Sequence, residues 1–283
     1  MNPRILFFAF QFLILNSKFL IASDNSPLGA RSSGIGGASV SLADVWAVQN
    51  NQAGLGFQKN ISGGIVYENS FQIKELSMKA AVLAIPVKRG TIGFCVSDFG
   101  YSLYRENKIG LAFGKSFGDK LSAGVMMDYV ETKMAEYGKR NSLVAEAGIQ
   151  TTPLKNLTIG LHIYNLTKTK LTDYNDERIP TIMRLGFNYR FSKKVLVVVE
   201  TEKNIVKNAI VKAGVEYLPA KALYLRAGIS TNPSLSCFGV GINLKQFRVD
   251  ISTTYHSVLG FSPQVGLIWE IQKPKEIAPE INE

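Results

Sequence analysis

The sequence predicts an all-β protein: a transmembrane β-barrel of 14 antiparallel strands with an N-terminal hatch segment in its lumen. Three observations support this fold class. From Ser62 to Ile271, apolar side chains alternate with polar or small ones in blocks of roughly ten residues, each followed by a turn signal. A short apolar leader precedes the blocks. The connections between the blocks alternate between short and long.

Residues 1–23 have the pattern of a secretory signal peptide. A basic start at Arg4 is followed by an apolar stretch over 5–15 and by small residues at Ala22 and Ser23. This stretch is too short to span a membrane as a helix, and no later stretch offers the ~18 apolar residues that such a helix needs. We therefore expect the leader to be removed and any membrane crossing to be made by strands.

Each block reads as one strand, because a period of two places successive side chains on opposite faces of a sheet. Val125 and Met127 point one way, for example, while Gly124 and Met126 point the other. Residues 61–271 then form the barrel, and residues 272–283 form a polar, proline-broken periplasmic tail. We expect strands at 61–69, 77–87, 90–98, 106–118, 120–132, 141–152, 156–166, 180–191, 194–202, 208–217, 221–230, 235–244, 246–255 and 263–271.

The short connections indicate how the barrel is oriented. Tight turns lie on the periplasmic side of outer-membrane barrels, so we expect both termini in the periplasm of a Gram-negative bacterium. Each short connection carries or adjoins a lysine, which predicts a basic ring that meets lipid headgroups or an acidic periplasmic partner. The ring consists of Lys88, Lys120, Lys155, Lys193, Lys194, Lys221 and Lys245.

The same alternation sorts the aromatic and the inward residues. Aromatic side chains near strand ends, including Phe99, Tyr101 and Tyr129, are expected in interfacial belts. The inward positions are rich in glycine and in charges of both signs, so we expect a lumen of closely packed backbone braced by ion pairs. The expected inward charges are Asp128, Glu146, Arg184, Arg190, Glu200, Lys212, Glu216, Arg226, Arg248, Asp250 and Glu270.

No catalytic, cofactor or metal site is evident, and we expect a protein that is not an enzyme and needs no cofactor. The two histidines are His162, on a strand, and His256, in a loop beside a serine. Cys95 and Cys237 fall on strands that are not neighbours, which favours free thiols. The basic residues are spread over the turns rather than clustered among aromatic residues, so nucleic acid is not an expected partner.

Residues 24–60 precede the first strand and are rich in small residues. They read GARSSGIGGASVSLAD from Gly29 to Asp44, followed by NNQAGLG at 50–56. These motifs resemble the N-terminal signature of FadL-like outer-membrane barrels and, within them, the PorV/PorQ-like group attached to type IX secretion in Bacteroidetes. The chain departs from that signature with Ile35 in place of methionine and Gln52 in place of proline. The resemblance covers 27–56 and implies an inward-folded hatch, with matching residues at Arg31, Gly34, Gly36, Gly37, Asp44, Asn51 and Gly54.

Two functions follow from these expectations. The first is a non-enzymatic accessory subunit that docks onto a larger outer-membrane barrel and periplasmic or lipoprotein subunits for protein export or barrel assembly. The alternative is a FadL-like passive transporter of a hydrophobic small molecule, with its pocket between hatch and wall. Because a transporter should have long apolar outer loops and an apolar interior pocket, the short, mixed-charge loops and the expected polar lumen favour the accessory subunit.

Overall fold

The computed structural model describes residues 25–136, 138–169 and 178–271. The predicted signal peptide (1–23), the predicted C-terminal tail (272–283) and most of the longest link between strands lie outside the described residues.

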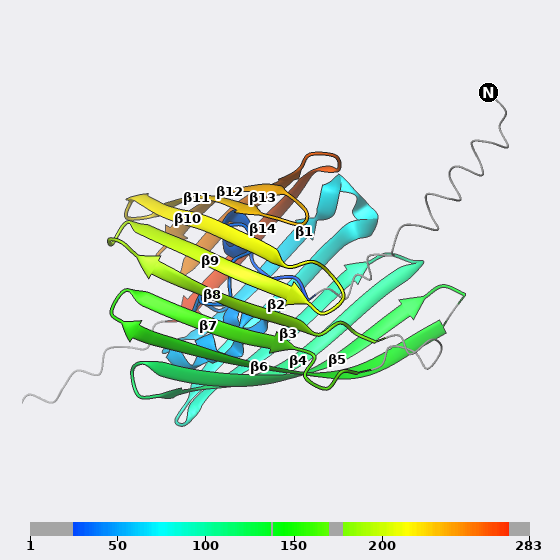
Figure 1. Ribbon diagram of the computed structural model, residues 1–283, viewed down its shortest axis with the longest axis horizontal. Coiled ribbons are helices and arrows are strands. Elements are labelled where there is room, and N and C mark those ends of the chain that lie inside the picture. The colour runs from blue at the N-terminus through cyan, green and yellow to red at the C-terminus, as the bar shows by residue number, and fades with distance from the viewer. Residues whose placement is uncertain (1–24, 137, 170–177, 272–283) are drawn as a thin grey trace, which may run out of the picture.

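Fourteen antiparallel strands form one closed barrel (Figure 1). Consecutive strands are neighbours, and β1 closes the barrel against β14 in a register that starts with Ile61 opposite Ile271. This architecture confirms the predicted barrel of 14 antiparallel strands. The strands are β1 (Ile61–Asn69), β2 (Ser77–Val87), β3 (Gly90–Gly100), β4 (Tyr104–Phe117), β5 (Leu121–Met134), β6 (Gly138–Leu154), β7 (Leu157–Tyr164), β8 (Ile182–Arg190), β9 (Val195–Asn204), β10 (Ile210–Ala220), β11 (Leu223–Ser230), β12 (Leu235–Leu244), β13 (Phe247–His256) and β14 (Gly260–Ile271).

The period of two in the sequence sets which face each side chain takes. On β5, Val125 is 57% exposed on the outer surface, whereas Ser122 is 0% exposed on the lumen side. On β7, Leu161 faces outward and His162 is buried. The predicted register is therefore correct at these strands, since a slip by one residue would exchange the two faces.

The two ends of the barrel differ. At the short-turn end, tight turns such as Lys88–Arg89 join the strands, and β1 begins and β14 ends there as well. At the opposite, long-link end, the connection from β1 to β2 contains two 3-10 turns, η2 (Ser70–Gln72) and η3 (Lys74–Leu76). All seven lysines of the predicted basic ring are exposed and lie in or beside the short turns.

Residues 25–57 lie inside the barrel, as the blue ribbon in Figure 1 shows, and we call them the inner segment. They contain the short helices α2 (Ala30–Gly34), α3 (Ala47–Asn50) and η1 (Gln52–Phe57). α2 packs against β11–β14, whereas η1 packs against β3–β6. Asn51 begins η1, because its side-chain oxygen accepts a hydrogen bond from the N–H of Ala53. No helix in the described residues is long and apolar enough to cross a membrane.

Three residues lie elsewhere than predicted. Phe99 is not in an interfacial belt, because β3 continues to Gly100 and keeps Phe99 in phase with Cys95, toward the lumen. Arg190 and Glu270 are exposed rather than inward. They lie at the ends of β8 and β14, where the strands reach the rim of the barrel.

Candidate functional site

The lumen side of β1–β3 carries a cluster of buried apolar residues, and we call this cluster the apolar face. It consists of Val66, Ala80, Val82, Ala84 and Cys95, all buried. The inner segment packs against it in one hydrophobic cluster through Leu28, Val45, Trp46 and Val48. The predicted lumen of glycine and ion pairs is wrong for this face, because small apolar residues occupy the inward positions and larger apolar side chains fill the space beside them.

On the opposite side, six buried or half-buried side chains form a closed ring of alternating charge, which we call the ion ring. In order, they are Arg31, Glu216, Arg226, Asp250, Arg248 and Asp44, with successive N–O distances of 2.7, 2.7, 2.8, 2.9, 3.6 and 3.0 Å back to Arg31. Burial opposes the charge of Arg31, yet the carboxylates of Glu216 and Asp44 raise the pKa of its guanidinium above the ordinary value. The ring therefore joins the inner segment to β10, β11 and β13 with balanced charge.

A second network holds the backbone of the inner segment. Glu200 of β9 accepts hydrogen bonds from the N–H groups of Ser39 (2.7 Å) and Val40 (2.8 Å). Lys212 of β10 contacts Glu200 at 3.1 Å and Glu202 at 2.8 Å. We call the lumen side of β9–β13, with both networks, the charged face.

Three of the four predicted hatch glycines lie where another part of the chain approaches closely. A Cβ at Gly34 would lie 3.1 Å from the Cα of Gly239, and a Cβ at Gly54 would lie 2.8 Å from that of Ala47. Gly36 has a φ of +79°, which favours glycine, and its Cβ would meet the carbonyl of Ile229 at 2.5 Å. Gly37 follows with a φ of +76°.

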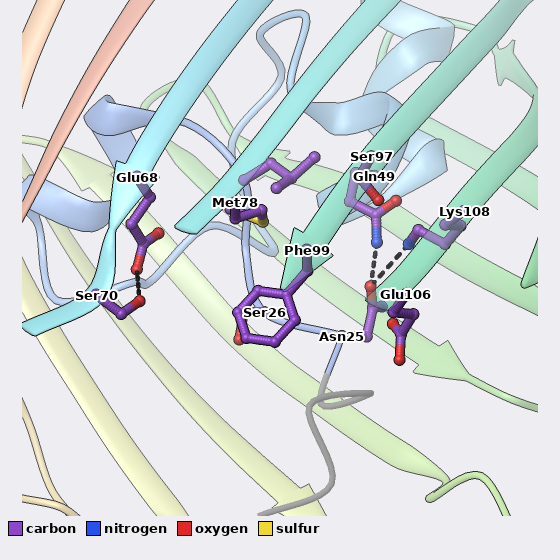
Figure 2. Close-up of a pocket in the computed structure, with 11 residues that line it drawn as sticks. Asn25, Ser26, Gln49, Glu68, Ser70, Met78, Ser97, Phe99, Glu106 and Lys108 are labelled. Carbon is purple, nitrogen blue, oxygen red and sulfur yellow. Dashed lines mark hydrogen bonds between the residues drawn. The ribbon is translucent and has the colours of Figure 1, made fainter. Parts of the chain in front are cut away.

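Asn25 and Ser26 line two cavities that open at the long-link end of the lumen. The first cavity has a volume of about 130 Å³ and lies beside the apolar face (Figure 2). The second cavity has a volume of about 240 Å³ and lies beside the charged face, next to Lys212 and Glu202. The wall of the first cavity includes Leu28, Glu68, Met78, Ser97, Phe99 and Lys108.

Polar groups gather at two ends of the first cavity, with Met78 and Phe99 between them (Figure 2). At one end, Oδ1 of Asn25 accepts hydrogen bonds from Gln49 and from Lys108, the latter at 3.3 Å. At the other end is the carboxylate of Glu68.

Glu68 accepts hydrogen bonds from two neutral donors. The hydroxyl of Ser70 lies 3.0 Å from its carboxylate, and the side-chain amide of Gln264 lies at 3.2 Å. Among residues 25–136, 138–169 and 178–271, no basic side chain forms an ion pair with it. Glu68 therefore differs from the carboxylates of the charged face.

The two histidines and the two cysteines have structural surroundings. Nε2 of His162 lies 2.9 Å from Glu146, and Nδ1 of His256 accepts hydrogen bonds from the N–H groups of Val258 and Leu259. Cys95 and Cys237 are free and buried. Within the described part of the chain, no three ligand side chains come together in a group that could hold a metal ion.

The predictions from sequence do not include the side chains of the first cavity, although the alternation contains the signal for them. Lys108 is in phase with the inward Gly110, and Glu68 is in phase with the inward Val66. Phase shows that these residues face the lumen. It does not show that they surround one space, because the other side of that space is formed by the inner segment, whose position in the lumen the alternation does not predict.

No protein-family model and no curated protein matches the chain. Among solved structures, the chain is similar to the toluene transporter TodX of P. putida, with a TM-score of 0.68 and 12% identity over 89% of this chain and 100% of that one. It is also similar to the toluene transporter TbuX of Ralstonia pickettii, with a TM-score of 0.65 and 12% identity over 87% and 97%. A Pseudomonas aeruginosa FadL homologue matches with a TM-score of 0.56 and 12% identity over 86% and 96%. The chain thus has the fold of FadL-type barrels.

These comparisons correct the predicted function. The similar structures are described as toluene transporters, so the prediction of an accessory subunit for protein export or barrel assembly is wrong and the alternative is favoured. The error has a physical cause. The prediction assumed a lumen without an apolar surface, whereas β1–β3 present one.

Proposed function

We propose that this chain is a passive transporter of small hydrophobic molecules across the outer membrane. The observation that carries the proposal is the first cavity, which lies beside the apolar face and the inner segment. A concave space with apolar walls and a few polar groups is the usual form of a small-molecule site. The fold shared with proteins described as toluene transporters supports the proposal.

The lumen offers two sides along which a molecule could move past the inner segment. On the apolar face, the segment is held by dispersion contacts of side chains such as Leu28 and Trp46, which a hydrophobic molecule can replace with its own. On the charged face, buried ion pairs would have to be broken. We infer that the transported molecule follows the apolar face.

In this proposal the barrel lies in the outer membrane of a Gram-negative bacterium, with the short-turn end toward the periplasm. The inner segment acts as the hatch, and the basic ring meets lipid headgroups. The nearer resemblance to the PorV/PorQ-like group of Bacteroidetes stays a prediction. So do contacts with a larger barrel or with periplasmic or lipoprotein subunits, which extraction of the native protein in mild detergent would test.

Uptake of radiolabelled toluene by a Gram-negative host without hydrocarbon transporters tests the proposal. Expression of the chain should raise the initial rate of uptake above that of the empty vector. Ser97→Trp places a large ring in the first cavity and should return the rate to the vector level. The matched control is Val96→Trp, at a neighbouring position that is 48% exposed on the outer surface, and it should transport normally.

Both tryptophan variants must first be found in the outer membrane as folded, heat-modifiable barrels. If folded wild-type protein leaves toluene uptake at the vector level, the proposed function is wrong. If Ser97→Trp and Val96→Trp transport equally well, the first cavity is not on the route.

A further inference from the structure

The first cavity has the size of a single ring. Its volume is about 130 Å³, and a cavity of about 150 Å³ in a protein interior accommodates benzene. Leu28, Met78 and Phe99 supply apolar walls. The cavity therefore has room for one such ring.

Glu68 gives this cavity a carboxyl group that forms no ion pair with a basic side chain of the described residues. On the charged face, Glu200, Glu202 and Glu216 each contact a lysine or an arginine at 3.1 Å or less. Within the part of the chain that the structure describes, the hydrogen-bond partners of Glu68 are the hydroxyl of Ser70 and the amide of Gln264. Removing a carboxylate from water without a cationic partner costs free energy, which a cation brought by a ligand would offset.

The cation at the far end of the cavity is already engaged. Nζ of Lys108 donates to Oδ1 of Asn25 and lies 4.0 Å from Asp128. Figure 2 shows Lys108 across the cavity from Glu68, with Phe99 between them. An ammonium group beside Glu68 would therefore lie at the end of the cavity away from Lys108.

We propose that the first cavity selects small molecules that join a protonated amine to one apolar ring, with the ammonium at Glu68 and the ring between Met78 and Phe99. This inference rests on the proposed function and specifies its substrate class. It distinguishes this chain from a transporter that takes hydrocarbons alone.

Three probes of equal ring size separate the possibilities: benzylamine, toluene and benzoate. Titration calorimetry on the barrel in lipid nanodiscs should show benzylamine binding about tenfold or more tightly than toluene, the gain expected of a charged hydrogen bond. Benzoate should bind more weakly than either. Glu68→Gln, which keeps the shape and removes the charge, should reduce the preference for benzylamine over toluene to less than about threefold. Glu68→Asp keeps the carboxylate and should retain most of the preference for benzylamine over toluene.

The outcomes separate this inference from the proposed function. Equal binding of benzylamine and toluene, or an unchanged preference in Glu68→Gln, overturns the amine specificity while toluene uptake still supports transport. Tighter binding of benzoate than of benzylamine would show that the charge of Lys108 dominates, and it would also overturn the amine specificity. Retained toluene binding by Glu68→Gln shows that the variant is folded, and if it fails to fold, the ratios for wild type and Glu68→Asp decide.

Discussion

The apolar face and the charged face hold the same inner segment by different means. On β3, a Cβ at Gly93 would meet the side chains of Leu55 and Val48 at 3.0 Å, so side chain packs on side chain. On β9, Glu200 binds backbone N–H groups of the segment. Dispersion contacts can be exchanged for others of similar volume, whereas a buried ion pair needs each partner. We infer from this difference that the charged face anchors the inner segment, whereas the first cavity lies beside the apolar face.

The largest effect is expected where the ion ring is opened. Glu216→Gln removes the carboxylate shared by Arg31 and Arg226 and leaves two buried guanidinium groups without it. We expect the free energy of unfolding, from urea titrations in lipid vesicles, to fall by about 3–5 kcal/mol. The control is Glu131→Gln, which breaks the more exposed pair with Lys139 and should leave stability unchanged. A loss no larger than the control's would mean that the charged face does not anchor the segment.

A smaller effect is expected from adding one methyl group at a close backbone approach. In Gly228→Ala, on β11, the new Cβ would overlap the backbone of Ile35 and Gly36. In Gly266→Ala, on β14, it would lie 3.6 Å from the Cβ of Ala30, an ordinary contact. The first variant should lose about 1–3 kcal/mol in the same titration and the second should match wild type. If Gly228→Ala and Gly266→Ala unfolded with the same free energy, the inner segment could shift on the charged face as well.

The smallest effect is expected from a volume-conserving change on the apolar side. Leu28→Met keeps the apolar contacts with β1–β3 and should cost less than about 1.5 kcal/mol, with toluene uptake retained. Leu28→Asn is the matched control, because it buries an amide among apolar side chains and should cost more. If Leu28→Met destabilised the barrel as much as Glu216→Gln, the two faces would not differ in the way proposed.

The strands of this barrel could be predicted because their signal is local. Alternation within one block identifies a strand, and a turn signal ends it, so β1, β2 and β12 begin and end where the sequence predicts. Errors arise at strand ends, where alternation alone does not show how far pairing continues. β3 and β6 are longer than predicted, and the extension of β3 turns Phe99 into the lumen.

The candidate site could be predicted only in part because its contacts join distant residues. The motif identifies Arg31 and Asp44, yet nothing local indicates that Glu216, 185 residues from Arg31, completes their ion pairs. The sequence does not predict the apolar face either, since Ala80 and Ala84 have the pattern of ordinary small inward residues. Only the closed barrel shows that larger side chains of the inner segment cover them.

The pairing of β1 with β14 bears on the order in which the barrel is made. Ile61 and Ile271 are partners across this seam although almost the whole barrel sequence separates them, so we expect the seam to form last. Arg31 of the inner segment contacts Glu216 of β10 inside the finished wall, so we expect the segment to lie among the strands before the seam closes. We therefore expect the N-terminal residues to act in biogenesis as a template around which the last strands fold.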